Sequence, residues 1–220
     1  MEQKDISLWI TIYLKSYLNG IISFERRRYC TLSNIFGKNI FCGCFSLTKV
    51  DIPPFSNLQT IGSYAFSGSK IKEIYFPASL KILKEGWCNN LHNLTKIKIS
   101  PSNHQFIFKD GKYLLGKTDP NNNEFDTLLF ARRDIKEISI PLNIKIISSD
   151  SFHDCKNLTK VEIPPNLQII GPYAFDCCFY LDKVIIPSNS KLQTIEIGAF
   201  SFTKIEEIYF PSSLKELKEG

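Results

Sequence analysis

Apolar and polar residues alternate in a pattern that recurs along the chain. The segment 158–180, LTKVEIPPNLQIIGPYAFDCCFY, follows the template L-x-x-V-x-I-P-x-x-L-x-x-I-G-x-x-A-F. The prolines that end its strand-like part recur in steps of 23 or 24 residues, except across one long gap. Self-similarity at a fixed period predicts a repeat architecture, and about seven repeats exceed the three that such a fold needs to bury its faces. Further copies begin at Leu47, Ile71, Leu94, Ile135, Leu181 and Ile205, and a partial copy comprises Phe36, Gly37, Ile40, Phe41 and Cys44.

Each repeat predicts one coil of a solenoid. The period-two alternation of LTKVEIP is typical of a short strand with one buried face, and the proline ends it because proline donates no ladder hydrogen bond. Gly171 marks a turn where either a side chain is unwelcome or φ is positive. Ala174 and Phe175 then form a short helical turn that places the phenyl ring in the centre. The predicted fold is a β-rich solenoid, a right-handed superhelix with parallel strands and short helical turns.

The central position of each coil is expected to hold an aromatic ring. Phe66, Phe152, Phe175 and Phe200 occupy it in the regular copies. In the copy that contains LKILKEGWC, we assign this position to Trp87, in a coil that is then two residues shorter.

Residues 100–134 interrupt the period. Asp110-Gly111 separates QFIFK from KYLLG, which is a strong hairpin signal, and DTLLFAR at 126–132 suggests a third strand. We therefore expect a small three-stranded β-excursion inserted into one coil.

Residues 1–35 do not follow the repeat, which we assign to 36–220. The run Ile6–Ile22 is apolar and aromatic, but Lys15 interrupts it and acidic residues precede it. It is interpreted as an amphipathic cap for the open solenoid end, with a poor signal peptide and an interfacial helix followed by Arg26–Arg28 as alternatives. It is too short and too polar to predict a transmembrane span.

A longer repeat is also present, because residues 57–86 and 191–220 match at 21 of 30 positions. The first block continues into Trp87 and Cys88, whereas the second stops at Gly220. The last repeat is therefore expected to be truncated.

The recurring I-x-I-P, L-x-x-I-G-x-x-A-F and Asn-Leu residues resemble the BspA-type leucine-rich repeat of surface proteins from bacteria and parasitic protists. The excursion, with Asn103, Phe106, Asp110-Gly111 and Tyr113, also resembles an insert of that family. The resemblance implies a curved solenoid without catalysis, a role in adhesion, and a protein or glycan partner on another cell or in the matrix. It implies a cell-surface or secreted location. Because no clear signal peptide is present, a cytoplasmic protein-interaction scaffold is the alternative function.

Composition, charge and short motifs limit the classes of function that we expect for the chain. The contents of 43% hydrophobic and 22% charged residues are those of a soluble globular protein. The net charge of +5, with Lys and Glu interleaved along the repeats, does not indicate nucleic-acid binding. No zinc-type C-x-x-C pair and no hydrolase or phosphate-loop motif is present, so we predict no enzyme, no metal site and no cofactor. Of the seven cysteines, Cys44, Cys155 and Cys178 share one repeat position and are interpreted as buried core residues.

The outward strand positions form the candidate partner-binding strip, in which Tyr75, Ile185 and Tyr209 are apolar points among charges. An equally weighted interpretation is a solvated, salt-bridged sheet face. Asn93 and Asn157 stand in Asn-Leu-Thr sequons and are possible glycosylation sites if the chain is secreted. The oligomeric state is left open. The strip comprises Lys49, Asp51, Glu73, Tyr75, Lys96, Lys98, Glu137, Ser139, Lys160, Glu162, Lys183, Ile185, Glu207 and Tyr209.

Overall fold

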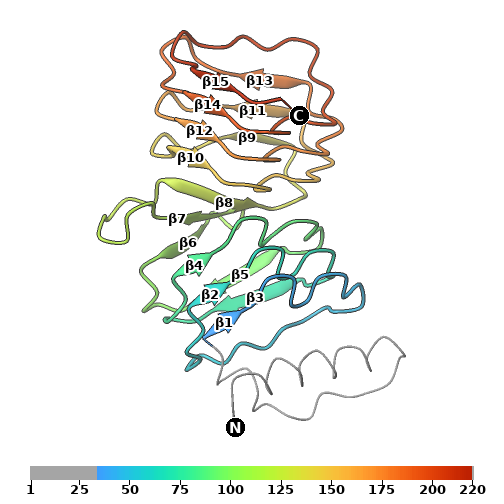
Figure 1. Ribbon diagram of the computed structural model, residues 1–220, viewed down its shortest axis with the longest axis vertical. Helices are drawn as coiled ribbons and strands as arrows, with labels where there is room; N and C mark the ends of the chain where they lie inside the picture. Colours follow the sequence, from blue (N-terminus) through green and yellow to red (C-terminus); the bar gives the residue numbers. More distant parts are fainter. Residues whose placement is uncertain (1–33, 220) are drawn as a thin grey trace.

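The computed structural model describes residues 34–219, which form an elongated stack of coils (Figure 1). The N-terminal coils lie at the bottom of this view and the C-terminal coils at the top. The proposed capping run Ile6–Ile22 lies outside the described residues. Within the described range, no helix has the length and apolarity needed to cross a membrane.

The coils supply strands to two arrays that run side by side along the stack (Figure 1). The first array comes from the I-x-I-P segments and contains β3 (Glu73–Phe76), β5 (Lys96–Ile99), β9 (Glu137–Ser139), β11 (Lys160–Glu162) and β13 (Lys183–Ile185). The second array comes largely from the L-x-x-I segments and contains β1 (Ile35–Phe36), β2 (Thr60–Ile61), β4 (Ile82–Leu83), β10 (Ile146–Ile147), β12 (Ile169–Ile170), β14 (Thr194–Ile195) and β15 (Glu216–Leu217).

Neighbouring coils pair in parallel with equivalent residues opposite one another. Ile138, Val161 and Val184 are direct partners in β9, β11 and β13. Ile138 and Val161 are buried and Val184 is half-buried, whereas the residues on either side point outward. This register follows from the alternation, because a slip of one residue would turn every apolar side chain to solvent. The predicted parallel-stranded solenoid is confirmed.

The segment after each second-array strand is a series of tight turns. Ala174 N donates to Gly171 O at 3.3 Å, and Cys178 N donates to Phe175 O at 3.2 Å. Positive φ values at Tyr173 (53°) and Cys177 (59°) prevent the turns from joining into a helix. The expected helical turns are therefore isolated hydrogen-bonded turns, and residues 34–219 contain no helix.

The central phenylalanines stack from coil to coil. Phe152 and Phe175 lie 4.7 Å apart between ring centroids, and Phe175 and Phe200 lie 5.3 Å apart, both with nearly parallel rings. Phe41 and Phe66 repeat this arrangement near the N-terminal end at 5.4 Å. The stacked rings fill the space that the coils enclose.

Trp87 is not in the central position, contrary to our assignment. Leu83 pairs with Ile61, so Cys88 lies five residues after its strand residue, as Phe66 does. The coil keeps its normal length, Cys88 takes the place of the phenylalanine and Trp87 takes that of the alanine. The indole is buried against Phe76 and Phe130, at centroid distances of 5.8 and 6.0 Å. The strand register therefore determines which residue takes the central position. The indole ring of Trp87 fills space beside the β-excursion.

The β-excursion is confirmed. It consists of β6 (Phe106–Lys109), β7 (Tyr113–Gly116) and β8 (Thr127–Ala131), joined by antiparallel pairing. Asp110 and Gly111 both have positive φ, and Lys112 N donates to Lys109 O at 3.0 Å, which closes the predicted hairpin. β8 also pairs in parallel with β10, so the excursion returns the chain to the second array.

A buried arginine lies where two hydrophobic cores meet. The lower core is built around Phe66 and Phe76 and the upper core around Phe152 and Phe175. The Arg133 guanidinium donates to the carbonyl oxygens of four residues from both sides of the junction, at 2.6–3.2 Å, and lies over the Phe130 ring. These carbonyls belong to Cys88, Ala131, Asp150 and Ser151. The cation therefore joins backbone groups at the point where the excursion interrupts the regular stacking.

Candidate functional site

The outward side chains of the first array form a surface that we call the strand face. Its upper patch lies on β9, β11 and β13, where parallel pairing sets side chains in two rows. All of these residues are exposed or half-buried. One row is Glu137, Lys160 and Lys183, and the other is Ser139, Glu162 and Ile185.

The lower patch of the strand face lies on β3, β5 and the segment before them. Glu73 is the direct partner of Lys96, and Tyr75 is the direct partner of Lys98. Lys49 forms an isolated parallel bridge with Glu73, which extends the row by one coil. Asp51 is exposed beside Lys49.

The two patches belong to separate sheets. β3 and β5 form a two-stranded sheet, and β9, β11 and β13 form a three-stranded one, with no pairing between β5 and β9. β6 packs against β5 where the next coil would otherwise continue. The excursion thus divides the strip suggested by the sequence into two patches.

Charges within each patch neutralise one another. Lys98 Nζ lies 2.5 Å from Glu73 Oε1, and Lys160 Nζ lies 2.6 Å from Glu162 Oε1. The hydrogen bond from Lys98 lowers the pKa of Glu73, and that from Lys160 lowers the pKa of Glu162. Because these pairs are exposed and screened by solvent, they contribute little to stability and leave the charged groups available to a partner.

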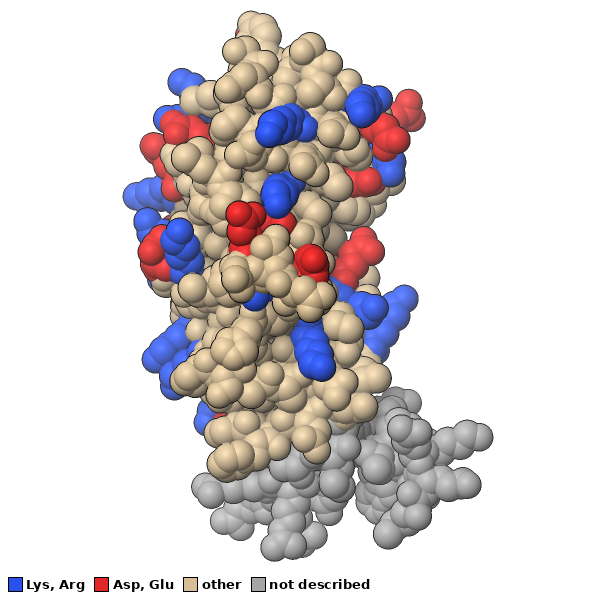
Figure 2. Space-filling view, turned by 90° about the vertical axis from the view of Figure 1, so that its left-hand side faces the viewer, with Lys and Arg blue, Asp and Glu red and all other residues tan. Residues whose placement is uncertain are grey.

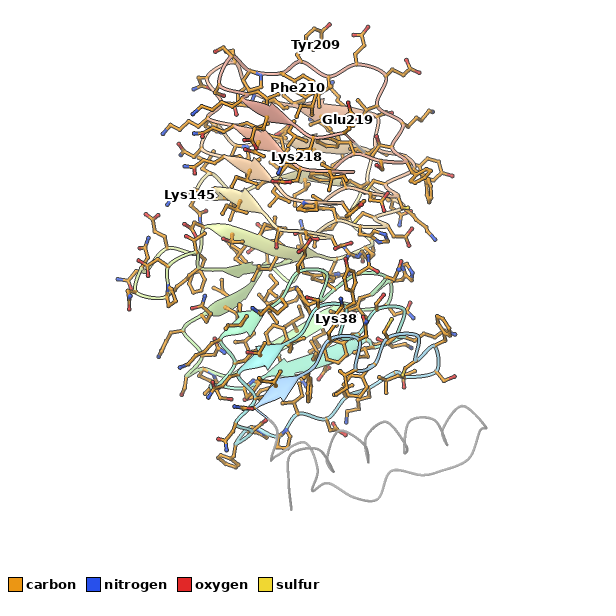
Figure 3. The ribbon with its side chains drawn as sticks, in the orientation of Figure 1. Lys38, Lys145, Tyr209, Phe210, Lys218 and Glu219 are labelled. Carbon is orange, nitrogen blue, oxygen red and sulfur yellow. The ribbon has the colours of Figure 1, made fainter. Side chains whose placement is uncertain are left out.

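Glu207 and Tyr209 occupy the next coil, but residues 205–211 form no strand. Tyr209 is 79% exposed and its hydroxyl lies 3.2 Å from Glu207 Oε2. Tyr209 and Phe210 lie at the C-terminal end of the stack (Figure 3). The structure therefore places these two strip residues beyond the last paired strand of the first array.

The two sequons are accessible. Asn93 and Asn157 are both exposed. The hydroxyls of their threonines, Thr95 and Thr159, donate to Lys72 O and Lys136 O of the preceding coil. The Asn-Leu-Thr sequence thus also serves the stacking of the coils.

Three side chains of the types that bind metal ions lie close together although no sequence motif connects them. His153 Nε2 lies 3.3 Å from Asp176 Oδ2, and Cys177 Sγ lies 3.6 Å from Asp176 Oδ1. Because His153 and Asp176 are 23 residues apart, no short motif connects them. An alignment of the repeats would have found them, since both directly follow the central phenylalanine.

An open groove of about 590 Å³ lies between β5, β6 and the loop after β7. Apolar residues such as Ile99, Phe106 and Phe125 and polar residues such as Asn103 line it together. His104 and Lys117 are the titratable groups among the described residues that line it.

The stacked coils with in-register parallel strands and a repeated apolar template define a leucine-rich-repeat solenoid. The chain belongs to the BspA type leucine rich repeat region family, whose model matches residues 30–112 and 123–220 in six copies. The resemblance inferred from the repeat residues is thereby confirmed.

Two solved structures share the fold. The pneumococcal vaccine antigen PcpA superposes with a TM-score of 0.72 at 24% identity, over 82% of this chain and 43% of that one. A leucine rich cell surface protein from Faecalibacterium prausnitzii superposes with a TM-score of 0.67 at 21% identity, over 82% of this chain and 52% of that one. The chain thus spans about half the length of these structures, or less. No curated protein gives a significant match.

Proposed function

We propose that the chain is a non-enzymatic binding module whose strand face engages a protein or glycan on another cell or in the matrix. One observation carries the proposal. In-register stacking repeats outward side chains in two patches, each with an apolar residue among charges: Tyr75 in the lower patch and Ile185 in the upper. Aromatic and aliphatic anchors surrounded by polar groups are typical of interface centres.

A surface location is part of the proposal. Family membership and the cell-surface protein among the structural neighbours support it. Protease shaving of intact source cells that express the tagged protein tests it, combined with glycosidase treatment. Cleavage on intact cells and a mass shift that Asn93→Gln and Asn157→Gln remove are the expected results. Protection from protease without a glycan would contradict the surface location and favour a cytoplasmic scaffold.

Binding itself is tested with purified protein on immobilised matrix and on intact cells. We expect Tyr75→Ser and Ile185→Asp each to weaken binding, since each removes an apolar anchor from one patch. Gln168→Glu and Gln193→Glu lie beside the second array and serve as matched controls that keep full binding. Equal binding by all four variants would place the interface outside the strand face.

A further inference from the structure

Two successive turns in the C-terminal half of the stack carry side chains that are able to bind a metal ion. His153 follows Phe152, and Asp176 and Cys177 follow Phe175. The equivalent residues are Cys42 and Gly43 after Phe41, Ser67 and Gly68 after Phe66, and Ser201 and Phe202 after Phe200. The repeat therefore does not need metal-binding side chains at these positions, and the turns after Phe152 and Phe175 bring such side chains together from two adjacent coils.

The backbone fixes these two turns relative to one another. Phe152 N donates to Ala174 O and Asp154 N donates to Asp176 O, both at 2.8 Å. The His153 imidazole is thereby held against the Asp176 carboxylate. Cys177 is held at a φ of 59° on the same turn as Asp176. Residues that are distant in the sequence thus meet on a rigid part of the solenoid.

The three side chains lie close enough together to approach one metal ion. One ligand atom from each of His153, Asp176 and Cys177 lies within 4.8 Å of the other two. Tetrahedral zinc with nitrogen, oxygen and sulfur ligands sets neighbouring ligand atoms about 3.3–3.7 Å apart. His153 Nε2 lies 3.3 Å from Asp176 Oδ2, which falls in that range, and Cys177 Sγ lies 3.6 Å from the other oxygen of the same carboxylate, Oδ1.

We propose that His153, Asp176 and Cys177 bind a divalent transition metal ion of the zinc class, with a fourth position open to water. Imidazole, carboxylate and thiolate together favour such an ion over Mg²⁺ or Ca²⁺, which take oxygen ligands. The side chains of His153 and Asp176 are 10% and 15% exposed, so an ion can reach them from solvent. The ion would link two coils through their turns.

Binding of a cation would require Cys177, but not His153, to lose a proton. Burial, and then the charge of Arg133, lowers the pKa of His153, so the imidazole is neutral and keeps a lone pair at pH 7. Burial and the Asp176 carboxylate raise the pKa of Cys177 to about 11. A bound dication would stabilise the thiolate beside the carboxylate, so binding is expected to release a proton.

Cobalt(II) is the probe for this site, with tag-free full-length protein treated with chelator beforehand. We expect saturable binding, a thiolate-to-cobalt charge-transfer band, visible bands of a tetrahedral ion and displacement by Zn²⁺. Cys177→Ser should abolish the charge-transfer band and weaken affinity by more than about tenfold. Cys42→Ser, at an exposed cysteine away from the site, is the control and should leave both unchanged.

Asp176→Asn is the second variant, used to separate ligand loss from misfolding. It should weaken cobalt affinity by more than about tenfold but keep the charge-transfer band at saturation, because the thiolate remains. Absence of saturable binding by the unaltered protein at millimolar cobalt would overturn the proposal. So would equal affinity and spectra for the unaltered protein and Cys177→Ser.

Discussion

At the scale of single residues, the central phenylalanines carry the stacking energy. Phe175 is fully buried, with Phe152 on one side and Phe200 on the other. Its replacement by alanine should lower the free energy of unfolding by about 3–5 kcal/mol, since it leaves a cavity between two rings. Urea denaturation measures the loss. Phe55→Ala removes a ring that is 94% exposed and should be neutral; equal losses in both variants would contradict the stacking role.

Asp126 makes stability depend on pH in the acid range. Its side chain is 2% exposed and accepts hydrogen bonds from Thr118 N, Thr118 Oγ1 and Lys145 Nζ at 2.7–3.2 Å. Lys145 lies at the edge of the stack (Figure 3). Burial acts to raise the pKa of Asp126, but these bonds outweigh it and hold the pKa below its usual range.

Because the folded pKa of Asp126 is depressed, its contribution is present above the unfolded pKa of about 3.9 and is lost as pH falls through the folded value. Asp126→Asn should cost about 1–3 kcal/mol at pH 7, and the difference from the unaltered protein should shrink below about pH 4. Chemical denaturation at several pH values measures this. A difference that is constant with pH would refute the role of the charge.

At the scale of elements, the close approach of adjacent coils depends on glycine. A Cβ built on Gly171 would lie 2.8 Å from Ile147 O of the preceding coil, whereas Gly37 has open space at that position. Neither glycine has a positive φ, so of the two reasons offered for Gly171 by its sequence, close packing is the correct one.

Gly171→Ala should therefore lower stability by about 1–3 kcal/mol, the usual cost of overpacking. Gly37→Ala should be neutral or slightly stabilising, because it only reduces the entropy of the unfolded chain. Thermal unfolding of the two variants compares them directly. If both shift the midpoint equally, the contact with Ile147 does not limit coil spacing.

The sequence predicted the regular strands and the hairpin better than the features that depend on contacts between distant segments. Alternation and proline spacing predicted the parallel strands, and Asp110-Gly111 predicted the hairpin, because both signals are local. The predicted central position of Trp87 was wrong because we based it on the aromatic residue type. The actual position follows from the strand register, which depends on pairing with the neighbouring coil. The buried Arg133 and the grouping of His153 with Asp176 depend on contacts between segments distant in the sequence, which no local pattern encodes. The division of the strand face arises in the same way, from packing of β6 on β5.

At the scale of the whole molecule, charge is unevenly distributed along the stack. Residues 34–117 contain eleven lysines and four acidic residues, whereas residues 118–219 contain eleven basic and fifteen acidic residues. On the side of the molecule shown in Figure 2, Lys and Arg dominate the lower half and acidic residues gather in the upper half. Although the net charge of the whole chain is modest, residues 34–117 thus carry a clear excess of basic side chains.

This asymmetry predicts where an acidic glycan would bind. The protein should be retained on immobilised heparin at low ionic strength and released by salt, since screening weakens attraction between exposed charges. Lys72→Glu with Lys81→Glu, both exposed and in the basic half, should lower the salt concentration needed for elution. Lys191→Glu with Lys204→Glu changes the net charge equally in the other half and should have a smaller effect. Equal shifts in the two double variants would mean that net charge, and not its position along the solenoid, determines retention.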